Sequence, residues 1–353
     1  MKTLLSFVSA SLLAVSFSFA QVPGIPGLSR ATVATGPQGT TLGANTTSSS
    51  GGIDLANRVK LRGYVDFMYE NVDDERAKHD KGFGTTADVD FLFDFSPVTA
   101  ELHTELQSGG VSLEQAFIRY SVNRDFNISM GRQLSTLGFE GDEAPNLYQV
   151  SNAYLMTDAA GVRRNYVDGI RANFNNGRFG FSIGLHNRLF PDLAPTTPPS
   201  TPASYDNTNN GDMAVDLQAA IMIVPGLEGR LGYASESRAN DDDIEQFNAW
   251  LAYNDRALTL AVEYDNWDIG PRDIWDIMLM GNYQFNDVFG LTLRYSHEDE
   301  DSKADSDRFT IYASFTVTDN LRFGLEYSHA SVDGATGADY DVDEFYAESL
   351  LSF

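Results

Sequence analysis

Charged side chains recur at every second position of many short segments, and rings of such charges can set ion preference in a channel. The basic members of these rows are Arg58, Lys60, Arg62, Arg119, Arg171, Arg230, Arg294, Arg308 and Arg322. The acidic members are Asp66, Glu70, Asp88, Asp90, Asp94, Glu101, Glu105, Asp216, Glu228, Glu263, Asp276, Glu326, Glu344 and Glu348. Acids outnumber bases, which favours cations. The alternative is that many of these charges pair with neighbours and select nothing.

Between the charged positions lies a second row without charge, and this alternation predicts the elements that position the charges. In 308–317 the uncharged row is Phe309, Ile311, Ala313, Phe315 and Val317. A period of two predicts strands with one apolar face. A strand of about 10 residues can cross a bilayer at a tilt, with one face toward lipid and the other toward water.

Strand-like segments of this kind follow one another through the chain from residue 58, at a fairly even spacing. They are 58–70, 87–95, 98–107, 111–122, 126–132, 166–174, 178–187, 213–224, 227–235, 245–253, 257–265, 273–285, 289–297, 308–317, 321–329 and 342–353. Short turns rich in Asn, Asp, Gly and Pro alternate with long polar stretches such as 71–86, 134–165, 188–212, 298–307 and 330–341. The sequence therefore predicts an all-β fold, a transmembrane antiparallel up-and-down β-barrel of about 16 strands with short periplasmic turns and long extracellular loops.

The N-terminal part of the chain predicts export and a simple leader. Residues 1–20 have an apolar run after Lys2 and small residues at Ser18 and Ala20, which indicates a cleaved signal peptide. Residues 21–57 are rich in Pro, Gly, Ser and Thr and predict a flexible leader, so that the barrel occupies 58–353. The chain has no cysteine and a formal net charge of −26. The absence of cysteine excludes disulfides, and the strong negative charge argues against nucleic acid as a partner.

The last strand ends on Phe353, and this ending resembles the C-terminal signature that the barrel-assembly machinery of Gram-negative bacteria reads. The residues that carry it are Phe345, Leu351 and Phe353. The segment from Gly131-Arg132-Gln133 through Gly138-Phe139-Glu140 also resembles a segment of the β-barrel porin family of Gram-negative outer-membrane channels. In general porins the loop at the place of 134–165 folds inward and narrows the channel with acidic residues. The resemblance implies that the acidic residues narrowing the channel here are Glu140, Asp142, Glu143 and Asp158. They would face a basic stripe formed by Arg294, Arg308 and Arg322.

These observations predict an outer-membrane porin, a water-filled channel for passive diffusion of small hydrophilic solutes with a weak preference for cations. The alternatives are a structural or adhesive barrel, or a barrel hydrolase without an open pore. The expected partners are outer-membrane lipid and lipopolysaccharide. The sequence does not decide the oligomeric state, and a homotrimer is one of the alternatives. The sequence predicts no enzyme activity and no cofactor. It also predicts no metal site, because the five histidines lack short ligand spacing and Asp241-Asp242-Asp243 lacks the glycine and glutamate of an EF-hand loop.

Overall fold

The computed structural model describes residues 53–56, 58–76, 79–140, 144–154, 166–190, 213–237, 243–270, 272–300, 304–334 and 339–353. The predicted signal peptide and most of the predicted leader lie outside these residues. The described part is almost entirely strand, with one short 3-10 helix, η1 (Ala144–Asn146). None of its helices is long and apolar enough to cross a bilayer.

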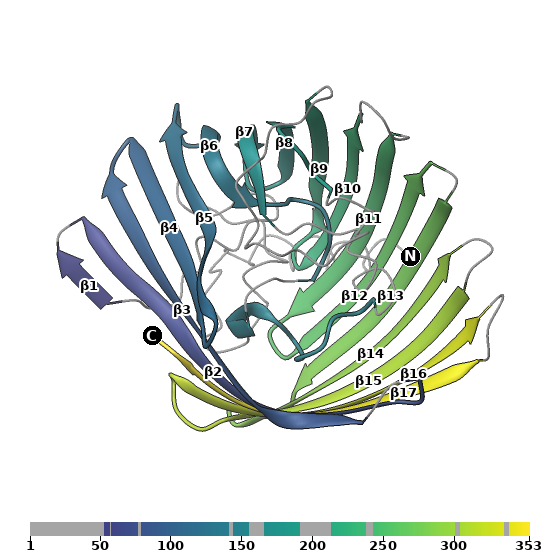
Figure 1. The fold of residues 1–353 in the computed structure, drawn as a ribbon. Coiled ribbons are helices and arrows are strands. Elements are labelled where there is room, and N and C mark those ends of the chain that lie inside the picture. Colours follow the sequence, from purple (N-terminus) through teal and green to yellow (C-terminus); the bar gives the residue numbers. More distant parts are fainter. Residues whose placement is uncertain are drawn as a thin grey trace, which may run out of the picture.

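Sixteen antiparallel strands form a closed ring (Figure 1), as the alternation of apolar and charged rows predicts. They are β2 (Val59–Asp74), β3 (Asp80–Phe95), β4 (Val98–Gln107), β5 (Gly110–Ser121), β6 (Phe126–Leu134), β7 (Tyr166–Asn175), β8 (Phe179–His186), β9 (Ala214–Val224), β10 (Leu227–Glu236), β11 (Ile244–Asp255), β12 (Leu258–Ile269), β13 (Arg272–Gln284), β14 (Phe289–Glu300), β15 (Ala304–Thr316), β16 (Leu321–Gly334) and β17 (Tyr340–Ser352). Each strand pairs with the next along the chain. The ring closes because β17 pairs with β2 from Asp74–Val342 to Tyr64–Ser352. A closed ring leaves no backbone edge facing lipid.

A short strand that the sequence did not predict lies at the end of the predicted leader. Strand β1 (Ile53–Ala56) pairs with residues 59–61 of β2. Its position follows from the closure, since β17 pairs with β2 only as far as Gly63, whose N–H and C=O both bond Phe353. The first residues of β2 therefore have free N–H and C=O groups on that side, and β1 satisfies them.

Several of the predicted long loops are in fact continued hairpins. The segment 71–86 was expected to be a loop, but β2 continues to Asp74 and β3 begins at Asp80. The same extension shortens the predicted loops 298–307 and 330–341, where β15 and β16 extend to Ala304 and Gly334. The prediction was wrong because it followed side-chain alternation. Beyond the membrane both faces meet water, so alternation ends while the backbone ladder continues.

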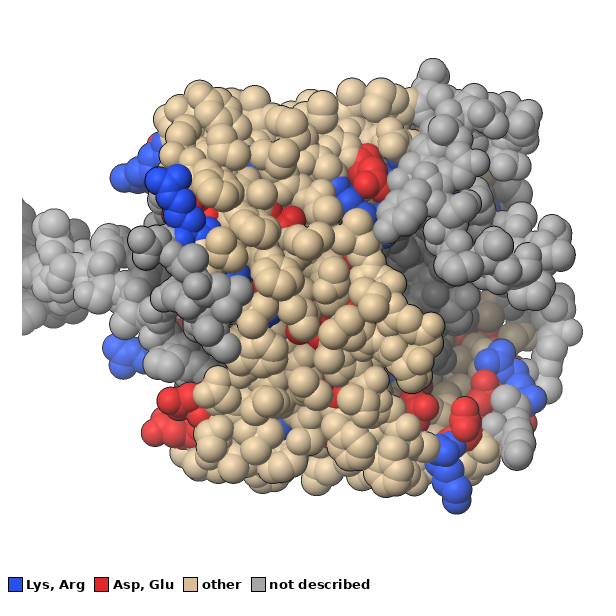
Figure 2. Space-filling model, turned by 60° about the vertical axis from the view of Figure 1, so that its left-hand side comes forward, with Lys and Arg blue, Asp and Glu red and all other residues tan. Residues whose placement is uncertain are grey.

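The outer wall of the barrel is apolar. On β15 the side chains of Phe309, Ile311 and Phe315 point outward and are more than a third exposed. Ile311 lies between Leu293 of β14 and Tyr327 of β16, which are also exposed. Figure 2 shows the outer surface as a broad field of uncharged side chains, with charges gathered mainly toward its margins. So large an exposed apolar surface indicates contact with lipid.

Candidate functional site

The charged rows of the strands face the interior, where most of the predicted basic residues are buried and paired. The pairs are Arg62 with Asp90 (2.6 Å), Arg119 with Glu101 (3.4 Å), Arg171 with Asp216 (2.9 Å), Arg230 with Glu228 (2.6 Å), Arg294 with Glu140 (2.5 Å), Arg308 with Glu344, and Arg322 with Glu348 (3.2 Å). Buried pairs contribute little net stability, but loss of one partner leaves an uncompensated charge at a cost of about 3–5 kcal/mol. The positive charges of the wall are thus neutralised locally.

The two remaining basic candidates lie at the end of the barrel where β2 begins. Arg58 and Lys60 are both exposed. The guanidinium of Arg58 lies 5.9 Å from the ring centre of Phe95. These two residues therefore belong to the rim, apart from the buried pairs.

The segment after β6 lies inside the barrel, in the part of it that the structure describes, 134–140 and 144–154 (Figure 1). Carboxylates on the wall accept hydrogen bonds from its backbone. Glu263 of β12 accepts from the Phe139 N–H at 2.6 Å, and Glu326 of β16 accepts from the N–H groups of Val150 (2.5 Å) and Ser151 (3.0 Å). The segment is thereby fixed to two places on the wall that lie four strands apart in the ring.

Arginines on the wall bind the same segment through its carbonyl groups. Arg294 donates to the carbonyl oxygens of Ser151 (2.8 Å) and Asn152 (2.6 Å). Arg308 donates to Asn152 (2.9 Å), and Arg322 donates to the carbonyl of Ala144 in η1 (3.1 Å). The stripe of three arginines thus serves as a set of anchors for the inner segment.

Glu140 is the acidic residue of this segment that the structure places. It lies at the junction of the two arms of the segment and the wall, because it binds Arg294 and also accepts from the Gln149 side chain (2.5 Å) and the Ala153 N–H (2.7 Å). The other acidic residues predicted for the constriction, Asp142, Glu143 and Asp158, lie outside the described residues.

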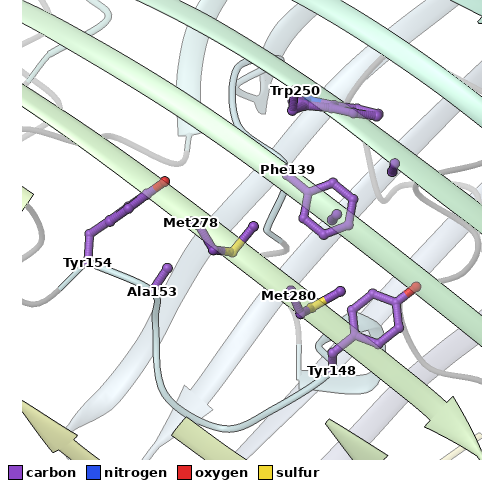
Figure 3. Close-up of a cluster of buried hydrophobic side chains, with 9 residues drawn as sticks. Phe139, Tyr148, Ala153, Tyr154, Trp250, Met278 and Met280 are labelled. Atoms are coloured by element: carbon purple, nitrogen blue, oxygen red, sulfur yellow. The ribbon is translucent and has the colours of Figure 1, made fainter. Parts of the chain in front are cut away.

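An apolar cluster holds the inner segment against β11, β12 and β13 (Figure 3). Phe139, Tyr148 and Tyr154 of the segment pack there. The wall contributes Trp250, Ala252, Ala261, Met278 and Met280, all buried. The Phe139 ring meets Trp250 edge-on, with ring centres 5.4 Å apart. Aromatic rings bury a large apolar area, so this cluster stabilises the position of the inner segment.

A second apolar cluster lies at the other ends of β11, β12 and β13 and extends to β7, β9 and β10. It joins Phe190, which follows β8, to Trp267 of β12, with ring centres 5.7 Å apart. Its other members are Val167, Leu189, Ala214, Ala234, Ile244, Ile269 and Ile274, and Leu137 of the inner segment packs against it. The interior beside β7–β13 is therefore filled by side chains.

These clusters are what the sequence analysis missed. It treated the inward rows as polar and identified neither Trp250 nor Met278 as an interior contact. A signal was present, since 249–252 and 277–280 are apolar at every position and so supply apolar side chains to both faces. The anchoring roles of Glu263 and Glu326 had no such signal, because they depend on where a distant loop lies.

The remaining candidate residues from the sequence are those at the C-terminus and the histidines. Phe345 and Leu351 point outward and are exposed, and Phe353 ends the pairing with β2. Buried His103 lies between Asp90 (3.0 Å) and Glu101 (3.1 Å). Across the described ranges no three side chains form a group that could hold a metal ion.

A closed ring of strands with an apolar outside, a charged inside and a loop segment bound within it defines a β-barrel channel of the outer-membrane type. The chain belongs to the family of Gram-negative porins, whose sequence profile matches residues 31–348.

Solved structures share the fold at low sequence identity. The anion-selective porin from Comamonas acidovorans superimposes with a TM-score of 0.64 at 14% identity, covering 84% of this chain and 99% of that one. OmpF of Salmonella typhi, in complex with daunomycin, gives 0.61 at 15% identity, covering 83% and 98%. A trimer form of OmpT of Vibrio cholerae gives 0.53 at 14% identity, covering 84% and 100%. No curated protein matches this chain in sequence.

Proposed function

We propose that this porin passes small hydrophilic solutes by passive diffusion and weakly prefers cations. The observation that carries the preference is the pairing of the interior arginines. Each of the seven buried arginines of the predicted basic rows has a carboxylate partner. Acids are in excess in the inward rows, so neutralised arginines leave a net negative interior. A negative wall raises the local concentration of cations and lowers that of anions.

The inner segment, in its described parts 134–140 and 144–154, supports the proposal by narrowing the bore. A barrel of about sixteen strands is wide enough for a water-filled channel, and a segment bound across it reduces the cross-section. Glu140 contributes no free charge to this narrowing because Arg294 binds it. The preference for cations therefore comes from the wall, and we expect it to be weak.

Planar-bilayer recording tests the proposal. We expect discrete conductance steps on insertion and, across a potassium chloride gradient, a reversal potential displaced toward the potassium equilibrium potential. A reversal potential displaced toward chloride would refute the charge argument. Absence of conductance steps from folded protein would favour the structural, adhesive or hydrolytic alternatives.

The remaining expected partners are proposals of the same kind. The apolar outer wall supports contact with outer-membrane lipid and lipopolysaccharide, and the apolar run within residues 1–20 supports export by a signal peptide. Outward-facing Phe345 and Leu351, together with Phe353 at the end of the pairing with β2, support recognition by the barrel-assembly machinery. A homotrimer is supported by the trimer form of the similarly folded OmpT of Vibrio cholerae. Cross-linking in native membranes tests it, with a single band at monomer size as the result against it.

A further inference from the structure

Two histidines on the inner wall of the barrel are fully buried, and their ring nitrogens have different surroundings. His103 lies on β4 and His186 ends β8, both without exposed surface. At His103 both nitrogens contact carboxylates, since Nδ1 lies 3.0 Å from Asp90 Oδ1 and Nε2 lies 3.1 Å from Glu101 Oε2. At His186, within the described chain, Asp216 is the one carboxylate at ion-pair distance, 3.2 Å from Nε2.

His103 joins two arginine–carboxylate pairs into one chain of alternating charge across β2, β3, β4 and β5. Arg62 donates to Asp90 Oδ2 from Nε at 2.9 Å and from Nη2 at 2.6 Å. Arg119 donates from Nη1 to Glu101 Oε1 at 3.4 Å. In each carboxylate one oxygen therefore meets an arginine, and the other oxygen meets the imidazole of His103.

The two short contacts of His103 decide the form of its ring. A neutral imidazole has one N–H donor and one lone-pair acceptor, whereas an imidazolium has two donors. A neutral ring at this place would turn its lone pair toward one of the two carboxylates, and a buried contact between two acceptors is unfavourable. A doubly protonated ring faces both carboxylates as a cation, and the nearby opposite charges favour that form.

The charged side chains around His103 leave place for one more positive charge. Inward positions of the neighbouring strand segments supply the carboxylates Asp88, Asp90, Glu101 and Glu105. They also supply the basic side chains Lys60, Arg62 and Arg119. On β5 the cross-strand partner of His103 is Gln115, which is buried and uncharged. A cationic His103 therefore makes the two kinds of charge equal in number, whereas a neutral ring leaves the acids in excess.

The surroundings of His186 place no such demand on its ring. Asp216 accepts from Arg171 Nη2 at 2.9 Å through Oδ2 and faces His186 through Oδ1. The other ring nitrogen, Nδ1, lies 2.5 Å from the position that a Cβ on Gly169 would occupy. One proton, on Nε2, satisfies this arrangement. His186 is therefore a matched control, equally buried on the same inner wall.

We infer that His103 carries a positive charge at neutral pH and that this charge weakens the preference of the channel for cations. The charge offsets one carboxylate on the β2–β5 side of the wall, so the interior is less negative there than the arginine pairs alone would make it. The effect on ion preference rests on the proposed function, whereas the charge of His103 does not. His103 is thus a specificity-determining residue of the wall.

Nitrogen NMR of the folded, histidine-labelled protein in detergent micelles tests the charge directly. The two nitrogens of a doubly protonated imidazole resonate close together, whereas those of a neutral ring lie far apart. We expect the His103 ring to be doubly protonated at about pH 7.5, where an unperturbed histidine is mostly neutral. Replacing each of the five histidines by glutamine in turn assigns the signals. His103 is then identified by elimination even if its own variant does not fold, and a neutral His103 ring would overturn the inference.

Reversal potentials across a potassium chloride gradient, recorded in planar bilayers at about pH 7.5, test the effect on ion preference. We expect His103→Gln to shift the reversal potential further toward the potassium equilibrium potential, because the wall loses a positive charge. His186→Gln should leave it unchanged, and heat-modifiable mobility on gels verifies that both variants are folded barrels. An unshifted His103→Gln, or an equal shift in both variants, would show that His103 does not set ion preference through its charge. If the unmodified protein shows no conductance steps, the proposed function fails, and the NMR measurement still decides the charge.

Discussion

Replacing Ile311 by arginine tests the assignment of the outer wall. The charge-free outward row of β15 begins at Phe309 and continues to Val317, the residue just after the strand ends; Ile311 is 37% exposed and Val317 is 54% exposed. At a rise of about 3.4 Å per residue and a tilt of about 40°, this row spans roughly 21 Å of the membrane normal. Ile311 then lies roughly 5 Å from the middle of the row, and Val317 lies roughly 10 Å from it.

Depth therefore sets the expected cost. Arginine on the lipid face costs about 2–4 kcal/mol at the midplane and about 0–1 kcal/mol near the interface. We expect Ile311→Arg to lower the free energy of folding into lipid by about 2–3 kcal/mol, and Val317→Arg to lower it by at most about 1 kcal/mol. The second variant introduces the same charge on the same face of the chain, so the difference between the two isolates depth.

The assay is reversible folding into phosphatidylcholine vesicles, followed by the fluorescence of the three tryptophans across a urea or guanidinium titration. Equal costs for the two variants would show that β15 does not sit in the bilayer as described. A cost below about 1 kcal/mol for Ile311→Arg would show that its outward row does not face lipid.

Three further predictions concern the inner segment and the chain end. Arg294→Met should destabilise the barrel by about 3–5 kcal/mol in the same titration, because Glu140 loses its charge partner; adding Glu140→Gln should recover part of that, and additive losses would contradict the pairing. Trp250→Ala should cost about 3–5 kcal/mol through the cavity left beside Phe139 and should increase open-channel noise, whereas quiet channels of unchanged stability would show that the cluster does not hold the segment. Deletion of Phe353 should lower the amount of barrel inserted in cells several-fold while folding in detergent changes little; equal insertion would argue against a role in assembly.

The ring of strands was predictable because a membrane barrel imposes a period-two pattern on each strand. The row of Phe309, Ile311 and Phe315 against Arg308 and Thr310 places one face in lipid without any knowledge of neighbours. The strand limits were less predictable at the loop end. Residues such as Asp305 and Asp333 pair within the β15–β16 hairpin although their side chains carry no alternation signal.

The interior was predictable in composition and not in arrangement. The sequence identifies Arg294 and Glu140 as charged residues, but their contact joins positions 154 residues apart through a loop whose direction only tertiary packing decides. In the same way, the alternation of β13 does not show that Met278 meets Tyr154 rather than water. These contacts depend on where segments far apart in the chain meet, which local periodicity does not encode.

The pairing of β17 with β2 has a consequence for how the protein forms. Asp74 meets Val342 and Tyr64 meets Ser352, so the seam joins almost the two ends of the strand series. Loop-closure entropy makes such a contact late and slow to form. Until it forms, two strand edges carry unbonded N–H and C=O groups that lipid cannot solvate. An incomplete sheet is therefore unstable in the bilayer. We expect pairing of β17 with β2 to be the step that makes insertion stable.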